Sequence, residues 1–97
     1  MSRDAVIAVI RAHLLELRQR FGVRDLSVFG SVARDEATGT SDVDVLVEFD
    51  GPTTFDGYFG LKERLEEVLG TRVDLATPAM LKPRLKVEVE RQGVPVA

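Results

Sequence analysis

The sequence predicts a two-layer α+β fold, in which a small mixed sheet has helices packed on one of its faces. One observation is the alternation of apolar and polar residues over 42–49, which is typical of a half-buried strand. Another is the helical spacing of apolar residues over 4–21 and 54–69. Since helices and strands alternate along the chain, helices on one face are the economical arrangement, and the other face is free for a site.

The composition is that of an ordinary globular domain. The 97 residues are 44% apolar and 30% charged, which suits one domain over 1–97 and is too little for two. The net charge of -3 argues against general attraction to nucleic acid, and the lack of cysteine excludes disulfides and thiolate metal sites. No stretch resembles a signal peptide or a membrane span, so we expect a cytoplasmic protein. Pairing with itself or a partner would be unsurprising for so small a core.

The first half of the chain predicts a long helix followed by a short strand. We expect the helix over 4–21, with Asp4 as its N-cap and Gly22 as its stop. A strand over 26–29 then leads into a first turn of helix at Ser31, and a polar loop follows. The apolar face of the helix consists of Val6, Ile10, Leu14, Leu17 and Phe21.

The second half predicts two strands and two further helical segments. After the strand over 42–49, Thr54 caps a helix that ends at Gly70, and a third strand covers 72–76. Thr77 and Pro78 have the pattern of an N-cap followed by proline at the first helical position. The remaining expectations are a kink or restart at Pro83, inward-facing Leu85 and Val89, a stop at Gly93 and an edge strand over 94–96.

Two aspartates separated by one residue lie on the central strand. Asp42 and Asp44 share the face opposite the valines, roughly 7 Å apart by ordinary strand geometry. Carboxylates this close destabilise one another unless a cation or water lies between them. Hard oxygen ligands suit magnesium or manganese. Asp74, between Val73 and Leu75, leaves its own strand on the same side and is the natural third ligand.

A Gly-Ser turn precedes these aspartates. Gly30 lets a triphosphate approach the backbone without a side-chain clash, and the N–H groups that follow it attract phosphate oxygens. The Ser31 hydroxyl adds a donor, and Arg34, one turn later, can reach the same phosphates. Ser41, directly before the first aspartate, can orient a ligand or shape the loop. The combination predicts a metal-dependent site for a nucleoside triphosphate.

These motifs resemble those of a known family. Gly30–Arg34 followed by Ser41–Val47 is similar to the signature of the DNA polymerase beta-type nucleotidyltransferase superfamily, and the short length together with Val73–Leu75 resembles its minimal nucleotidyltransferase branch, the MNT-type antitoxins. The resemblance covers roughly residues 20–90 and implies the nucleotidyltransferase fold. It also implies transfer of a nucleoside monophosphate from a triphosphate, with release of pyrophosphate.

The resemblance assigns roles to the three aspartates. By analogy Asp42 and Asp44 bind two magnesium ions, and Asp74 binds the catalytic one and helps to deprotonate the attacking hydroxyl. Since the chain is too small for an acceptor pocket of its own, the acceptor is expected on a partner. The family implies that this partner is a HEPN-type toxin ribonuclease, which is silenced when AMP from ATP is added to one of its tyrosines. The expected assembly is a hetero-oligomer with the toxin, or a homodimer when the chain is alone.

Other interpretations stay open at this point. Asp42 and Asp44 can simply form a solvated strand face, and Gly30–Ser31 a plain turn with Ser31 as an N-cap. The protein can also be an antitoxin that acts by occlusion without catalysis, or a transferase for a small molecule or an RNA end. His13 and Tyr58 are interpreted as structural. The basic residues of the C-terminal helix are either a solvated face or a surface for docking the partner; they are Lys82, Arg84, Lys86 and Arg91.

Overall fold

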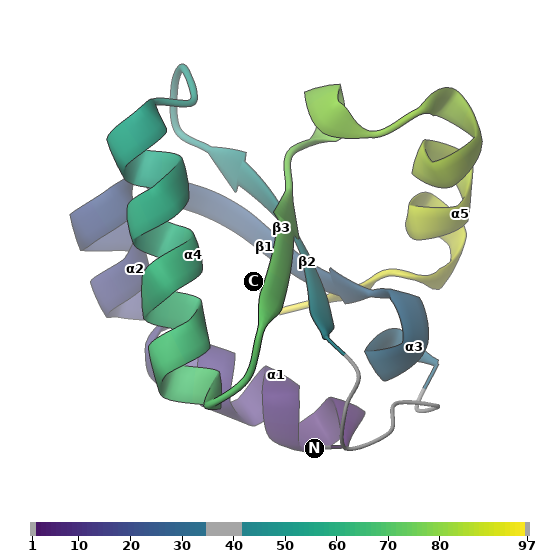
Figure 1. Ribbon diagram of the computed structural model, residues 1–97, viewed down its shortest axis with the longest axis horizontal. Coiled ribbons are helices and arrows are strands. Elements are labelled where there is room, and N and C mark those ends of the chain that lie inside the picture. Colours follow the sequence, from purple (N-terminus) through teal and green to yellow (C-terminus); the bar gives the residue numbers. More distant parts are fainter. Residues whose placement is uncertain (1, 35–41, 97) are drawn as a thin grey trace.

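The computed structural model describes residues 2–34 and 42–96, and its elements follow the predicted order (Figure 1). The strands are β1 (Val23–Phe29), β2 (Val43–Phe49), β3 (Val73–Ala76) and β4 (Val94–Pro95). The helices are α1 (Arg3–Ala12), α2 (Leu14–Phe21), α3 (Gly30–Ala33), α4 (Phe55–Leu69) and α5 (Pro83–Gln92), with a 3-10 turn, η1 (Pro78–Met80). Within the described ranges no helix is both long and apolar enough to cross a membrane.

The four strands form one mixed sheet in the order β3-β2-β1-β4. β1 pairs antiparallel with β2 and with β4, whereas β2 and β3 are parallel. A parallel pair needs a crossover connection, which α4 supplies between β2 and β3. The predicted small mixed sheet is confirmed, and so is the edge strand near the C-terminus.

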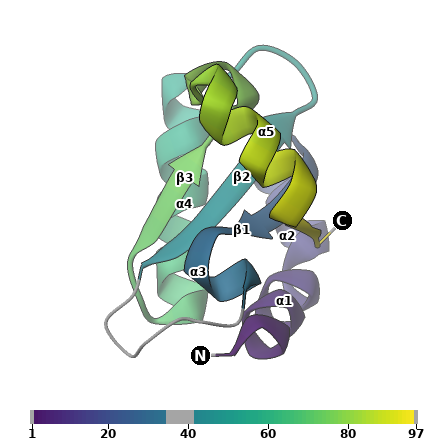
Figure 2. The same cartoon turned by 90° about the vertical axis from the view of Figure 1, so that its right-hand side faces the viewer.

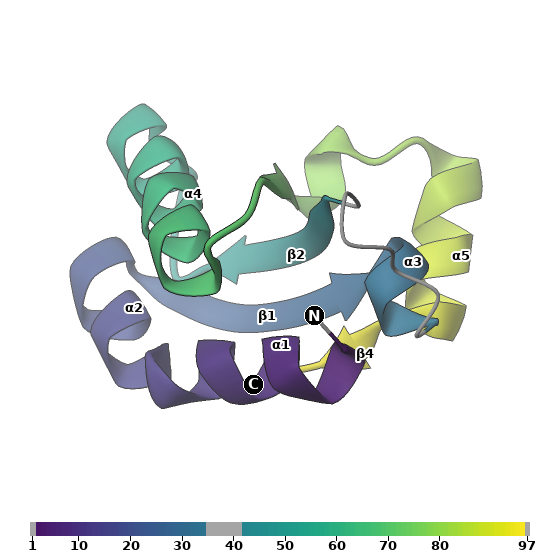
Figure 3. The ribbon, with the colours of Figure 1, turned by 60° about the horizontal axis from the view of Figure 1, so that its bottom comes forward.

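Three helices cover one face of this sheet, as Figures 1 and 3 show for α1, α2 and α4. The alternation along β2 directs Val43, Val45 and Val47 into the core beneath these helices, where at most 3% of each residue is exposed. Ile10 and Leu61 are completely buried on the helical side. The prediction of helices on one face is therefore confirmed for these three elements, which hold the core.

The fifth helix stands in front of the opposite face of the sheet (Figure 2). The sequence predicts that no helix packs on that face, which is free for a site, and that Leu85 and Val89 of α5 face inward. Val89 is indeed buried, at 6% exposed, but Leu85 is 40% exposed. Because α5 buries a single residue, it covers the second face without forming a second core.

The N-terminal helix differs from the prediction in two ways. It is divided into α1 and α2 at His13, whose backbone leaves the helical conformation while its Nδ1 lies 2.9 Å from the Val9 carbonyl oxygen. The N-cap is Ser2, whose hydroxyl accepts from the Ala5 N–H at 3.2 Å, and Asp4 lies inside the first turn. The structural interpretation of His13 is confirmed, because it links the two helices.

Other helix ends agree with the sequence more closely. Thr54 caps α4 by accepting from the Gly57 N–H at 3.0 Å, and the helix ends at Gly70. Pro83 is the restart, since α5 begins there. Thr77 makes no side-chain cap, and the segment after it is only the 3-10 turn η1.

Candidate active site

Asp44 and Asp74 are direct neighbours across two parallel strands. The register pairs Asp44 of β2 with Asp74 of β3. Their flanking partners, Val43 with Val73 and Val45 with Leu75, are buried on the helical side. Because side chains alternate along a strand, both carboxylates leave the sheet on the opposite face. The expectation that strand pairing brings Asp74 to Asp44 is confirmed.

The environment of Asp44 favours its protonated form. The pKa of Asp44 is raised from 3.8 to about 6, chiefly by burial and also by the negative charge of Asp74, a hydrogen bond with the Asp74 carboxyl and the charge of Asp42, while the charge of Arg34 opposes the rise. A carboxylate held beside two others has an unfavourable electrostatic energy that a bound cation would relieve. The charges of Asp74 and Asp42 thus both act on the Asp44 carboxyl in the folded chain.

The aspartate carboxylates are ligands of the kind that magnesium takes in proteins. Within residues 2–34 and 42–96, no group of three or more His, Cys, Asp or Glu side chains converges as a ready-made metal cage. Asp44 and Asp74 form the close pair, and Asp42, half-buried just before β2, acts on Asp44 through its charge. Magnesium is usually held by one or two carboxylates together with substrate phosphates, and this pair fits that pattern.

Gly30 is required by the close approach of Asp44. Phe29, the last residue of β1, is the register partner of Asp44, and Gly30 follows it with φ 69°. A Cβ atom at Gly30 would collide with Oδ2 of Asp44. The sequence suggests that this glycine leaves room for a triphosphate. In the structure the same room holds the Asp44 carboxylate, so the glycine first serves the placement of that aspartate.

The other residues of the Gly-Ser turn occupy separate places. Ser31 is half-buried inside α3 and is not its N-cap, so that part of the alternative interpretation is wrong. Arg34 follows α3, and its Nη1 donates to Gln92 Oε1 of α5 at 3.4 Å. Arg34 and Asp44 line the same pocket, and the positive charge of Arg34 lowers the pKa of Asp44. Ser41 lies outside the described residues.

Two contacts missed from the sequence fix the strand that holds Asp74. The Val73 N–H donates to Glu66 Oε2 at 3.0 Å, and the Tyr58 hydroxyl donates to the Leu75 carbonyl oxygen. Both side chains come from α4, and they form hydrogen bonds with the β3 residues on either side of Asp74. The half-buried Tyr58 is structural, as predicted, and its place beside Asp74 could not be read from helical spacing.

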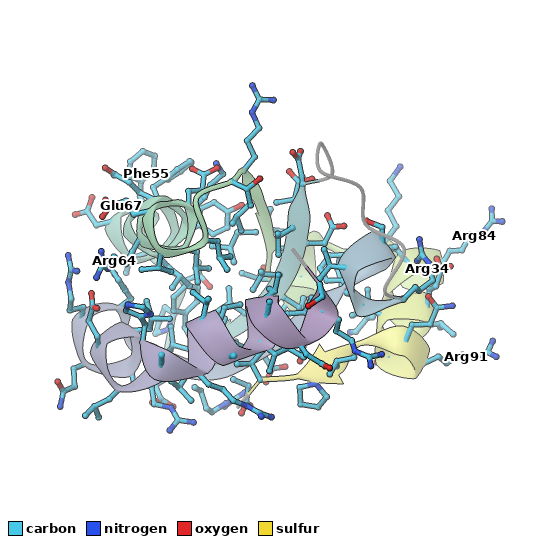
Figure 4. All side chains as sticks on the ribbon, turned by 90° about the horizontal axis from the view of Figure 1, so that it is seen from below. Arg34, Phe55, Arg64, Glu67, Arg84 and Arg91 are labelled. Atoms are coloured by element: carbon cyan, nitrogen blue, oxygen red, sulfur yellow. The ribbon has the colours of Figure 1, made fainter. Side chains whose placement is uncertain are left out.

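A pocket of about 260 Å³ opens between α5 and the end of the sheet near Asp44. Sequence reasoning gives no sign of it, because the polar residues of α5 look like a solvated helix face. Arg34, Arg84 and Arg91 project from α3 and α5 on this side of the molecule (Figure 4). The pocket is lined by Phe29, Gly30, Arg34, Asp44, Leu85, Glu88, Val89 and Gln92.

Comparison with known proteins assigns the chain to a family. A model of the nucleotidyltransferase domain matches residues 10–96. The chain belongs to this nucleotidyltransferase family. It is 42% identical over 94 residues to a protein adenylyltransferase named MntA from Thermococcus cleftensis, and the match covers 97% of this chain and 95% of the relative.

Solved structures of nucleotidyltransferases share the fold. One assigned as a minimal nucleotidyltransferase is 41% identical, with a TM-score of 0.82 over 98% of this chain and 96% of that one. Another is a complex of a tri-AMPylated HEPN toxin from Shewanella oneidensis with its MNT antitoxin. That match has a TM-score of 0.66 at 18% identity, covers 94% of this chain and 71% of the other, and bears on the fold alone. The predicted nucleotidyltransferase fold is confirmed.

Proposed function

We propose that this chain is the antitoxin of a toxin–antitoxin pair and transfers AMP from ATP to a tyrosine hydroxyl of a HEPN-type toxin. The observation that supports this most is the Asp44–Asp74 pair, coupled to Asp42 and set against Gly30, in a chain 42% identical to a protein adenylyltransferase. The fold is also similar to that of one chain in the complex of a tri-AMPylated HEPN toxin with its MNT antitoxin.

In the proposed reaction the hydroxyl oxygen of the acceptor attacks the α-phosphorus of ATP. The bond between that phosphorus and the oxygen bridging to the β-phosphate breaks, and pyrophosphate leaves with the electron pair. Asp74 accepts the hydroxyl proton. This aspartate is exposed on the edge strand β3, so a side chain on another protein can reach it.

Positioning and charge neutralisation account for most of the catalysis in phosphoryl-type transfer. Asp42, Asp44 and Asp74 would hold magnesium, which when bound neutralises charge on the phosphates and on the attacking and leaving oxygens. Gly30 and Ser31 orient the phosphates, and the guanidinium of Arg34 adds a positive charge on the same side. Glu66 and Tyr58 keep β3, and hence Asp74, in register.

Label transfer to the co-purified toxin partner distinguishes this reaction from others. ATP labelled at the α-phosphorus should label the partner protein, whereas ATP labelled at the γ-phosphorus should not. Asp56→Asn, on the first turn of the helix that covers the other face, is the matched control and should transfer normally. Label on the partner from the γ-phosphorus, or on added RNA or a small molecule instead, would contradict the proposal. Neutralisation of the toxin without any label would also contradict it and would favour an antitoxin that acts by occlusion.

A further inference from the structure

A single buried side chain attaches α5 to the rest of the molecule. Val89 is 6% exposed, and every other residue of the helix is exposed. Among the described residues, Val89 is also the one buried apolar side chain that lies outside the main hydrophobic core. By contrast, α4 buries Leu61, Leu65 and Leu69 in that core. Much less apolar contact therefore holds α5 on the sheet than holds α4.

Two cavities adjoin Val89 between α5 and the sheet. One is the pocket of about 260 Å³, which Asp44 of β2 lines. The other has a volume of about 120 Å³ and is lined by Leu46 of the same strand. Since Asp44 and Leu46 are two residues apart, they share one face of the sheet, here called the aspartate face. α5 stands over this face (Figure 2), and the space around its one buried contact is incompletely filled.

Polar contacts add little to the attachment of α5. Among the residues that the structure describes, no ion pair joins this helix to another element. Gln92 Oε1 accepts from Arg34 Nη1 at 3.4 Å, which is long for such a bond, and the contact is exposed to water. Val89 therefore supplies most of the attachment.

The chain is anchored on both sides of α5 independently of the helix itself. Before it, Thr77 is buried, and the connecting residues Leu81 and Lys82 have extended backbones. After it, Val96 lies in the main core, and its N–H donates to the Leu26 carbonyl oxygen at 2.8 Å. The helix can thus leave the sheet while the strands on either side of it stay in place.

We propose that α5 is a hinged cover over the aspartate face, which opens and unfolds as one unit while the core stays folded. A ten-residue helix detached from the sheet is too short to persist in water, so opening and the loss of its backbone hydrogen bonds coincide. Opening uncovers Asp44, which lies at the pocket beneath α5, whereas Asp74 is exposed already. α5 therefore controls access to one of the two paired carboxylates.

Amide hydrogen exchange followed by NMR tests this cover directly. Burial of one valine favours the closed arrangement by roughly 10- to 100-fold, and the amides of α5 should be protected by that factor. The amides of β2 should be protected at least about 1,000-fold, because they exchange only when the whole domain unfolds. Low concentrations of urea should accelerate exchange in β2 but hardly in α5, because opening of α5 exposes little surface.

Three variants separate α5 from the core. Val89→Ala should lower the protection of α5 by roughly 5-fold while β2 stays protected at least about 100-fold. Val87→Ala is the matched control, because Val87 lies on the same helix and is 55% exposed, and it should not lower the protection of α5. Ile10→Val, a small change in the main core, should lower the protection of β2 by roughly 5-fold and leave that of α5 unchanged.

A single cysteine reports whether opening uncovers the aspartate face. The natural chain has no cysteine, and Leu46 lies beneath α5, so Leu46→Cys gives one thiol at the covered surface. A thiol reagent should label this variant roughly 5-fold faster when Val89→Ala is added, and no faster when Val87→Ala is added. The same labelling rate in both combined variants would overturn the control of access by α5.

The exchange data can also contradict the cover. Exchange of α5 with the rate and urea dependence of β2 would overturn it, because the helix would then belong to the core unit. A loss of α5 protection in Ile10→Val, or none in Val89→Ala, would overturn it too. Unprotected α5 amides in the wild type would mean that the cover does not close. None of these measurements needs a nucleotide or a partner, so their outcome is independent of the test of AMP transfer.

Discussion

Replacing Asp44 by asparagine should stabilise the metal-free protein. Burial and the neighbouring carboxylates of Asp74 and Asp42 raise the pKa of Asp44 from 3.8 to about 6, so the ionised form is strained in the folded state. Asparagine has nearly the same shape and no charge, so it removes this repulsion. The variant should therefore gain stability while losing the carboxylate that the proposed reaction needs.

The size of the gain follows from the shift in the pKa. A rise of about 2 pKa units corresponds to roughly 3 kcal/mol at 1.36 kcal/mol per unit, which is an upper bound. Asp44 is partly exposed, and screening by water reduces this to about 1–2 kcal/mol. For a domain of this length the midpoint of thermal unfolding should rise by roughly 5–10 °C.

The pH dependence identifies the cause. Because the folded-state pKa is raised, Asp44 imposes no penalty below pH 3.8, where it is protonated in both states. The penalty grows as the pH rises and is complete above about pH 6. Thermal or urea unfolding in chelator should show Asp44→Asn more stable than wild type at pH 7.5 and equal to it near pH 3.5. Equal stability at pH 7.5, or an advantage that persists at pH 3.5, would refute the electrostatic reasoning.

Other predictions concern the residues that hold the site together. Gly30→Ala should lose at least about 1 kcal/mol more in urea unfolding than Gly70→Ala, because both glycines have φ 69° but only Gly30 faces Asp44; equal losses would exclude the clash. Tyr58→Phe should lose about 1 kcal/mol with its hydrogen bond to Leu75, and an unchanged melting temperature would contradict that bond. The Val73 N–H holds the pKa of Glu66 below its usual 4.5, so the stability from Glu66 is present above pH 4.5 and lost as the pH falls through the lower folded-state pKa. Glu66→Gln should therefore lose less stability than the wild type as the pH falls below 4.5. The same loss of stability in both proteins would contradict this assignment.

The sheet and the aspartate pair were accessible from local patterns. Alternation along 42–49 assigns one face to valines and the other to aspartates, and Val73 and Leu75 assign Asp74 in the same way. Period-two patterns report the face of a strand directly, so pairing of the two strands was enough to bring Asp44 and Asp74 together. The family motif adds the Gly-Ser turn in front of them.

The parts that were missed depend on long-range packing. His13 fits the helical period, so nothing in the spacing marks the break between α1 and α2. Only Val89 of α5 is buried, and a helix with one buried residue has the pattern of a solvated surface helix. The place of α5 over the aspartate face, and with it the pocket, is determined by the return of the chain to β1 through β4. The role of Gly30 likewise depends on the side chain of its neighbour across the sheet.

The intact mass of the co-expressed toxin partner tests the central claim most directly. With wild-type antitoxin, ATP and magnesium, the partner should gain one or more AMP-sized increments, and Asp56→Asn should give the same gain. The double variant Asp42→Asn/Asp44→Asn should leave the partner at its unmodified mass and the toxin active. A partner of unmodified mass that is neutralised equally by the wild type and the double variant would contradict AMP transfer.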